Sequence, residues 1–327
     1  MHLIKIFILS IVLFTNISFA QKKIAYCSNQ SRSGFLQIFT MNEDGSGIKQ
    51  LTDLEENCMK PRWSPDGKQL VFYSDKGLIY LIRNAESSTP ITPFYLWSGY
   101  NPFFLPDGDQ IMFNGEYEQV LSIFVIDTAQ YGTEPSLVSG GGYSNMQVLS
   151  KDGNTLIYST FEAGSKVIVA ADLNDTTENY LKQISNNNEA NLEPDISPDG
   201  TKIIYSSFDN NLKGTVKLNV NGNETSLTKG LGSSNVPRFS PDGKNISFVV
   251  INGSDVSLYI MDSEGNGKKD LNINGGSVGT FQWMDNDKII YDAGTETKTN
   301  IGIVNIKTGN SKIILEGGFH LHPSAQN

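Results

Sequence analysis

The sequence predicts an all-β fold, a closed seven-bladed β-propeller, and three observations support this prediction. A single phrase recurs along the chain. Its fullest copy is Pro-Arg-Trp-Ser-Pro-Asp-Gly-Lys at residues 61–68, followed by an apolar strand that reaches Phe72. The copies follow one another at the spacing of propeller blades. The seventh copy is divided between the two ends of the chain, which implies that the ends meet.

An aromatic residue closes each copy, and these aromatics recur at intervals of 41 to 47 residues. They are Tyr26, Phe72, Phe113, Tyr158, Tyr205, Phe248 and Tyr291. A four-stranded propeller blade takes about 40–45 residues. Helical repeats of this length would place apolar residues at i, i+3, i+4 and i+7. Here the apolar runs are short, β-branched or aromatic, and bounded by Gly, Asn, Asp or Pro, which favours strands.

Within a blade, the phrase predicts a hairpin made by the first and second strands. Pro sets φ near −65° in its turn, Asp bonds its own backbone, and Gly adopts the positive φ. A second hairpin, made by the third and fourth strands, follows each copy. The predicted strand pairs are 37–40 with 48–52, 79–82 with 91, 122–126 with 137–138, 166–170 with 181–184, 216–220 with 225–227, 257–261 with 269–271 and 301–305 with 312–315.

The two chain ends are predicted to complete one blade. The sequence contains seven second hairpins but only six complete first hairpins. Residues 322–325 align with residues 236–239, which form the first strand of a later copy, and residues 23–26 supply the missing second strand. Such pairing of the N- and C-terminal strands leaves no open sheet edge. A six-bladed ring remains the alternative if one hairpin has been miscounted.

Residues 1–20 are typical of a secretory signal peptide. Lys5 supplies the positive charge, residues 6–14 are almost wholly apolar, and Ser-Phe-Ala at 18–20 fits a cleavage site. No cysteine lies at the cleavage point, which disfavours a lipoprotein. The apolar stretch is shorter than the ~20 residues of a spanning helix, so we expect no membrane insertion. We therefore expect a periplasmic or secreted protein whose residues 21–327 form one propeller domain.

Charge and cysteine content restrict the functional classes. The chain has 35 acidic and 25 basic residues and a net charge of −10, which argues against nucleic acid and anionic membranes as partners. Acidity also serves solubility. Export would allow a disulfide between Cys27 and Cys58, and two half-buried thiols are the alternative. The sequence has no C-x-x-C pair, so a zinc knuckle is not supported.

The repeated phrase resembles the PD40, or WD40-like, repeat of TolB propellers. Residues 61–72, 194–205 and 237–248 match the pattern closely, and the resemblance extends over nearly all of residues 22–325. It implies a TolB-like propeller, although TolB itself carries an α/β domain before six blades. Similar repeats occur in prolyl-oligopeptidase-like peptidases. Those enzymes need a separate hydrolase domain, for which the repeats leave no residues over.

The candidate ligand-binding residues lie in loops that we expect around the channel. Tyr95, Trp97 and Tyr100 belong to an aromatic loop at 94–100, and Glu116 and Tyr117 belong to the neighbouring loop. Exposed aromatic residues stack on sugars or anchor peptides, and packing between blades is the alternative. Paired carboxylates could perform glycosidase chemistry, but acidic loops are usually solvated surface.

His320 and His322 form an H-x-H pair, which in a strand places both rings on one face. A metal would need a third ligand, and packing at the closing strand is the alternative role. We expect no metal site, no cofactor and no catalytic residue. The function predicted is a non-catalytic TolB-like scaffold that binds a protein or peptide in the cell envelope. The alternative is a carbohydrate-binding or polysaccharide-cleaving propeller of glycosidase or lyase type.

Overall fold

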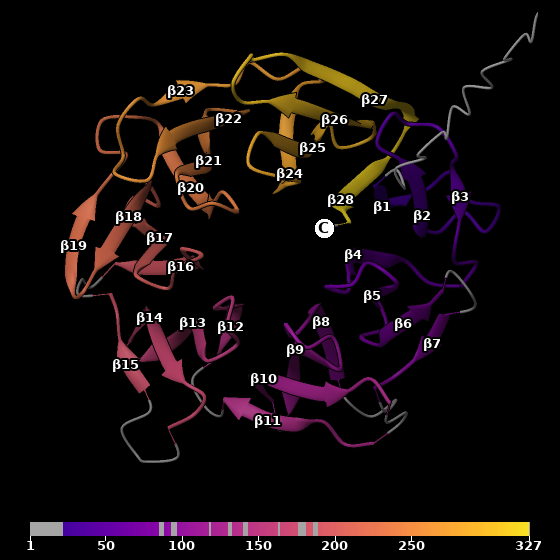
Figure 1. Cartoon of the computed structure of the whole chain (residues 1–327), viewed down its shortest axis with the longest axis horizontal. Coiled ribbons are helices and arrows are strands. Elements are labelled where there is room, and N and C mark those ends of the chain that lie inside the picture. Colours follow the sequence, from indigo (N-terminus) through magenta and orange to yellow (C-terminus); the bar gives the residue numbers. More distant parts are fainter. Residues whose placement is uncertain are drawn as a thin grey trace, which may run out of the picture.

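The computed structural model describes residues 22–84, 88–92, 97–117, 119–129, 133–139, 143–162, 164–175, 181–185 and 189–326. Seven four-stranded antiparallel sheets form a ring around a central opening (Figure 1). This arrangement confirms the predicted all-β, seven-bladed propeller. In the described ranges no helix is long and apolar enough to cross a membrane. The predicted signal peptide, residues 1–20, lies outside the described residues.

Each blade contributes one strand to the inner wall of the ring and one to its rim (Figure 1). From inside to outside, three blades are β28 (His320–Ala325), β1 (Lys23–Ser28), β2 (Gln37–Asn42), β3 (Lys49–Gln50); β4 (Cys58–Trp63), β5 (Gln69–Ser74), β6 (Ile79–Arg83), β7 (Ser88–Pro90); and β8 (Trp97–Phe104), β9 (Gln110–Tyr117), β10 (Val120–Asp127), β11 (Ser136–Ser139). The others are β12 (Asn145–Leu149), β13 (Thr155–Glu162), β14 (Ser165–Asp172), β15 (Leu181–Gln183); β16 (Ala190–Ile196), β17 (Lys202–Phe208), β18 (Gly214–Val220), β19 (Asn223–Ser226); β20 (Ser233–Phe239), β21 (Asn245–Asn252), β22 (Asp255–Asp262), β23 (Lys269–Asp270); and β24 (Ser277–Trp283), β25 (Lys288–Gly294), β26 (Thr299–Asn305), β27 (Ser311–Gly318).

The chain ends meet in one blade, as predicted. Strand β28 pairs antiparallel with β1, and Ser28 lies opposite His320 while Ile24 lies opposite Ala325. Beyond the ladder, the backbone N–H of Gln326 donates to the carbonyl of Lys23 at 2.8 Å. The C-terminal strand therefore forms the inner wall of the blade that begins at the N-terminus (Figure 1).

The repeated phrase folds into a turn held by one serine and one aspartate. Ser64 Oγ donates to Asp66 Oδ1 at 2.7 Å and accepts from the backbone N–H of Gln69 at 2.9 Å. The same two bonds recur at three later copies, Ser150 with Asp152, Ser197 with Asp199 and Ser240 with Asp242. Gly67 has a φ of 69°, which glycine adopts without steric cost. The repeated phrase thus forms the turn that joins the first and second strands of a blade.

The closing aromatics build the core between the blades. All seven are buried, and each shields apolar surface worth roughly 1.5–3 kcal/mol. Three of them stack on an aromatic residue of the third strand in their own blade, as Phe72 does on Tyr80 with ring centroids 5.1 Å apart. The repeated aromatic positions therefore contribute to the apolar core of every blade.

Every innermost strand contains a β-bulge near its middle, where its register with the second strand shifts. In six of the seven strands a non-glycine residue at the bulge has φ between 49° and 54°; these residues are Lys60, Asn101, Met146, Glu193, Val236 and His322. A bulge turns a side chain away from the direction that strict alternation would give it. The bulge residue and the residue two positions later line the central channel in most blades.

Candidate functional site

Two adjoining cavities occupy the central channel, with volumes of about 420 Å³ and 490 Å³. Four residues line both of them: Lys60, Arg62, Glu193 and Arg238. Strand β4 lies across the ring opening from β16 and β20, which belong to neighbouring blades (Figure 1). The two cavities are therefore neighbouring parts of one site, which only the closed ring assembles.

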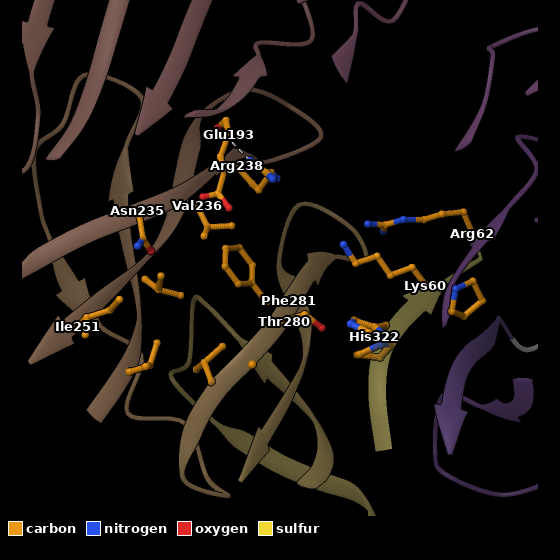
Figure 2. Close-up of a pocket in the computed structure, with 16 residues that line it drawn as sticks. Lys60, Arg62, Glu193, Asn235, Val236, Arg238, Ile251, Thr280, Phe281 and His322 are labelled. Carbon is orange, nitrogen blue, oxygen red and sulfur yellow. Dashed lines mark hydrogen bonds between the residues drawn. The ribbon is translucent and has the colours of Figure 1, made fainter. Parts of the chain in front are cut away.

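Three cations converge on this site. Lys60 and Arg62 extend from β4 into the opening, and Arg238 extends toward them from β20 on the other side (Figure 2). Lys60 Nζ donates to Asn101 Oδ1 at 2.6 Å. Arg238 Nη1 donates to the carbonyl oxygen of Pro237 at 2.7 Å and weakly to that of Glu193 at 3.4 Å. Both of these cations thus have protein partners.

Arg62 differs from the other two cations. Within the part of the chain that the structure describes, its guanidinium makes no hydrogen bond and no ion pair. Burial, and secondarily the charge of Arg238, lower the pKa of Arg62 to about 10. Burial and the charge of Arg62 likewise lower the pKa of Lys60. The channel therefore holds a half-buried guanidinium whose five donors find no acceptor among the described residues.

Two carboxylates on β16 moderate this positive charge. Glu193 lines both cavities and acts on Lys60 through space. Asp195 lies deeper, and burial raises its pKa, although its Oδ2 accepts a hydrogen bond from the backbone N–H of Phe239 at 2.7 Å. The acidic lining is thus confined to one strand, whereas the cations come from two.

His322 borders the same cavity from the closing strand. Burial, and then the charges of Lys60 and Arg62, lower the pKa of His322 to about 3, so its ring is neutral near pH 7. Its Nδ1 lies 3.8 Å from Cys27 Sγ. Its backbone N–H donates to Asp292 Oδ2 at 3.0 Å. His322 thus lines the site as an uncharged group.

One wall of the site is apolar. Val236, Val249, Ile251, Val256, Val278 and Phe281 line the smaller cavity. In Figure 2 the ring of Phe281 stands between Ile251 and the ends of Lys60 and Arg62. The site therefore combines an apolar pocket with a cationic opening.

The predicted aromatic site is only partly described by the structure. Tyr95 lies outside the described residues, and so do the side chains of Trp97 and Tyr117. Trp97 is paired with Glu116 across strands β8 and β9, so these positions belong to strands rather than to the predicted loops. The pairing of β8 with β9 extends to Trp97 and Glu116 because its register shifts twice, between Phe103 and Tyr100 and between Tyr100 and Trp97. Tyr100 is half-buried, and burial raises its pKa to about 12.

The two histidines of the predicted pair lie in different surroundings. His320 is fully buried, its Nδ1 lies 3.0 Å from Ser28 Oγ, and its ring meets that of Tyr26 edge-on. It lies in a different blade from Glu116, with the β4–β7 blade between them. Of the pair, only His322 borders the channel cavity. Across the described ranges, no three His, Cys, Asp or Glu residues are grouped to hold a metal.

Both cysteines are free and buried thiols, which is the alternative to the disulfide that export would allow. Cys27 Sγ faces His322, as described above, whereas Cys58 Sγ lies 3.8 Å from Thr52 Oγ1 and from Gln37 Oε1. The two sulfur atoms thus have separate polar neighbours. Burial raises the pKa of Cys27 and raises that of Cys58 to about 12, which makes both thiols poor nucleophiles.

A short glycine- and serine-containing motif leads into the inner strand β24. Residues 275–279 read Gly-Gly-Ser-Val-Gly, which fits the G-x-S-x-G pattern of hydrolase nucleophiles. That nucleophile occupies a sharp turn between a strand and a helix. Ser277 instead begins the inner strand β24, and its Oγ accepts from the backbone N–H of Val256 at 3.3 Å. The motif here is part of a blade.

The basic residues and Phe281 were missed by the sequence analysis, which placed the candidate binding residues in loops around the channel and not in the first strand of each blade. A usable signal exists, because proline follows the bulge residue in five innermost strands: Pro61, Pro102, Pro194, Pro237 and Pro323. Proline inside a sheet is restricted to edges and bulges, since it lacks an N–H. The residues beside these prolines are the channel-lining ones.

Comparisons with known proteins agree on the fold. The chain matches the family described as PD40, TolB beta propeller domain, over residues 10–224 and 149–326. It is 39% identical over 72 residues to the Tol-Pal system protein TolB of Wolbachia pipientis subsp. Culex pipiens, a segment that is 20% of this chain and 17% of that relative. The chain therefore spans a small part of this relative's length.

Two solved structures show the same architecture. TolB from Acinetobacter baumannii superposes with a TM-score of 0.57 and 18% identity, over 93% of this chain and 66% of that one. A puromycin-hydrolyzing peptidase from Mycobacterium tuberculosis superposes with a TM-score of 0.73 and 13% identity, over 91% of this chain and 52% of that one. At these identities the likeness concerns the fold alone.

Proposed function

Because this chain belongs to the TolB β-propeller domain family, we propose that it is a binding module that takes a protein or peptide partner into its central channel. The observation that carries this proposal is the composition of the channel wall. The turns and the core repeat from blade to blade, whereas the residues that face the channel differ in every blade. A surface that departs from the repeat is where a ring of similar blades can acquire a specific ligand.

The chemistry of the channel suits a peptide. Its apolar wall can receive a side chain, and its charged groups can bind backbone or terminal charges. The relative named as a Tol-Pal system protein supports a protein partner in the cell envelope. The typical signal sequence at residues 1–20 supports export to that compartment. Free, buried cysteines are compatible with this location, since neither thiol is reactive.

The carbohydrate alternative rests on a different place in the ring. Trp97 and Glu116 occupy paired positions on β8 and β9, and Tyr100 lies near them in β8. An aromatic residue beside a carboxylate is a common way to hold a sugar ring. A glycan array tests this alternative, because binding that depends on Trp97 and not on Phe281 would favour it over the peptide proposal.

The peptide proposal is tested by selecting a phage-displayed library, in which every peptide has a free C-terminus, on the purified protein. We expect enriched peptides whose affinity falls at least about tenfold in Phe281→Ala, because truncation of a central aromatic contact typically costs more than 1 kcal/mol. Leu137→Ala is the matched control, since Leu137 is 53% exposed on the rim strand β11. Failure to enrich any peptide, or equal binding by Phe281→Ala and wild type, would refute the proposal.

A further inference from the structure

We propose that the channel recognises the C-terminal end of a peptide, with Lys60, Arg62 and Arg238 binding its carboxylate and the apolar wall binding its last side chain. This inference rests on the proposed function, because it names the ligand class of the same site. It rests on three observations: an unpartnered guanidinium, convergent cations and an adjoining apolar pocket.

The first observation concerns Arg62. A guanidinium partly removed from water without a partner is costly to fold, because its donors lose part of their hydration and gain no hydrogen bond from the chain. The described residues offer Arg62 no hydrogen bond and no ion pair, although they satisfy the neighbouring Lys60 through Asn101. Arg62 is therefore organised for a partner that comes from outside the chain.

The second observation is the convergence of like charges. Arg62 and Arg238 approach from opposite sides of the opening and repel each other (Figure 2). An anion between them would add two attractions that offset this repulsion. A planar guanidinium binds a planar carboxylate through two parallel hydrogen bonds, which favours carboxylate among singly charged anions. Glu193 and Asp195 line the same channel, so a ligand carrying several negative charges is disfavoured.

The third observation distinguishes a chain end from an acidic side chain. At a C-terminus, the carboxylate and the last side chain leave the same Cα, so both groups lie within a few bonds of each other. The site offers the matching pair, because Phe281 and four valines line the same cavity as Lys60 and Arg62. An internal Asp or Glu carries its carboxylate on its own side chain, so the apolar side chain of a neighbouring residue lies more bonds away. The pocket therefore fits a terminal residue such as Leu, Val or Ile.

Calorimetric titration with three synthetic peptides tests this inference on the full chain. The first is N-acetyl-Gly-Gly-Gly-Leu with a free carboxylate, the second is its C-terminal amide, and the third is amidated and carries an internal Glu. We expect the free acid to bind at least about tenfold more tightly than either of the others, a difference of about 1.4 kcal/mol. Arg62→Gln and Arg238→Gln should each lower the affinity for the free acid several-fold and leave the affinity for the amide unchanged.

Lys312→Gln serves as the control, because it removes one positive charge from the exposed face of rim strand β27. It should bind the free acid as wild type does. Thermal melting of each variant checks that the ring is intact. Equal affinity for acid and amide, equal affinity for the internal Glu peptide, or no binding of the free acid at about 1 mM would overturn the inference. If peptides selected from the library depend on Phe281 but bind equally as amides, the channel proposal survives and only the carboxylate inference fails.

Discussion

Asp292 in the last blade accepts a hydrogen bond from the backbone N–H of His322 in the closing strand, with Oδ2 and N 3.0 Å apart. Its Oδ1 also accepts from the backbone N–H of Thr280 at 3.1 Å. Gly279 makes room for this carboxylate, since a Cβ there would lie 2.1 Å from Oδ1. An equivalent bond joins the bulge residue Val236 to Ser206 Oγ at 3.0 Å. Two of the bulges that shape the channel, at Val236 and His322, are thus held by side chains of the preceding blade.

We predict that Asp292→Ala destabilises the fold by about 2 kcal/mol or more. The substitution leaves two backbone donors, those of Thr280 and His322, without their acceptor, and each orphaned buried donor costs about 1–3 kcal/mol. Part of this loss is offset because the buried carboxyl is itself costly, as its pKa raised to about 6 indicates. Denaturant unfolding measures the difference. Asp287→Ala is the control, because Asp287 forms only a surface ion pair with Lys307. Equal destabilisation by the two substitutions would contradict the role of Asp292.

Deletion of residues 319–327 should lower the free energy of unfolding by more than about 3 kcal/mol. The deletion removes the ladder between β28 and β1 and uncovers Tyr26, which His320 covers edge-on. It also removes the carbonyl of Ser324, which accepts from Trp63 Nε1 at 3.1 Å. A synthetic peptide of residues 319–327 should restore part of the lost stability. An unchanged melting temperature after deletion would show that terminal pairing contributes nothing.

Arg62→Met should stabilise the protein without ligand, by on the order of 1 kcal/mol. The substitution removes a desolvated, unpartnered charge that Arg238 repels, and it keeps a long apolar side chain. Arg238→Met is the comparison variant. It breaks two hydrogen bonds to carbonyl oxygens, so its stability should increase less than that of Arg62→Met. Thermal denaturation of both variants measures the difference. A marked loss of stability in Arg62→Met would indicate that the guanidinium has a structural partner.

Ser197→Ala should lower the stability of the fold more at neutral pH than at acidic pH. The Ser197 hydroxyl is the main cause that lowers the pKa of Asp199 to about 2. A lowered carboxyl pKa contributes stability above the unfolded value of about 3.9, and this contribution is lost as the pH falls toward 2. The difference in melting temperature between wild type and Ser197→Ala should therefore decrease as the pH falls from about 5 to about 2, because the two pKa values lie in this range. Ser254→Ala, in an exposed turn, should show a constant difference, and a constant gap for Ser197→Ala would refute this account.

Much of the fold could be predicted from the sequence, because the repeat encodes local chemistry. The turn around Asp66 depends on residues within six positions, and the aromatic positions show which strand is buried. Closure could also be predicted, since the half-motifs at residues 23–26 and 322–325 complete one another.

The channel site could not be predicted in the same way. The sequence analysis placed the candidate residues in loops around the channel, whereas the bulge in the first strand of a blade turns residues such as Lys60 and Arg62 into the channel. Which of these side chains meet depends on the ring, because Arg62 and Arg238 are brought together from different blades. No local pattern carries that information, although proline after the bulge marks the position.

The central claim is that a peptide ligand enters the channel beside Phe281, and photocrosslinking tests it most directly. The photoreactive residue p-benzoylphenylalanine replaces Phe281 in one variant and Leu137, on the rim strand β11, in another. Each variant is irradiated with a peptide selected from the library. We predict a covalent product at position 281 and none at position 137. Crosslinking at position 137 but not at position 281 would contradict the claim that the ligand lies in the channel.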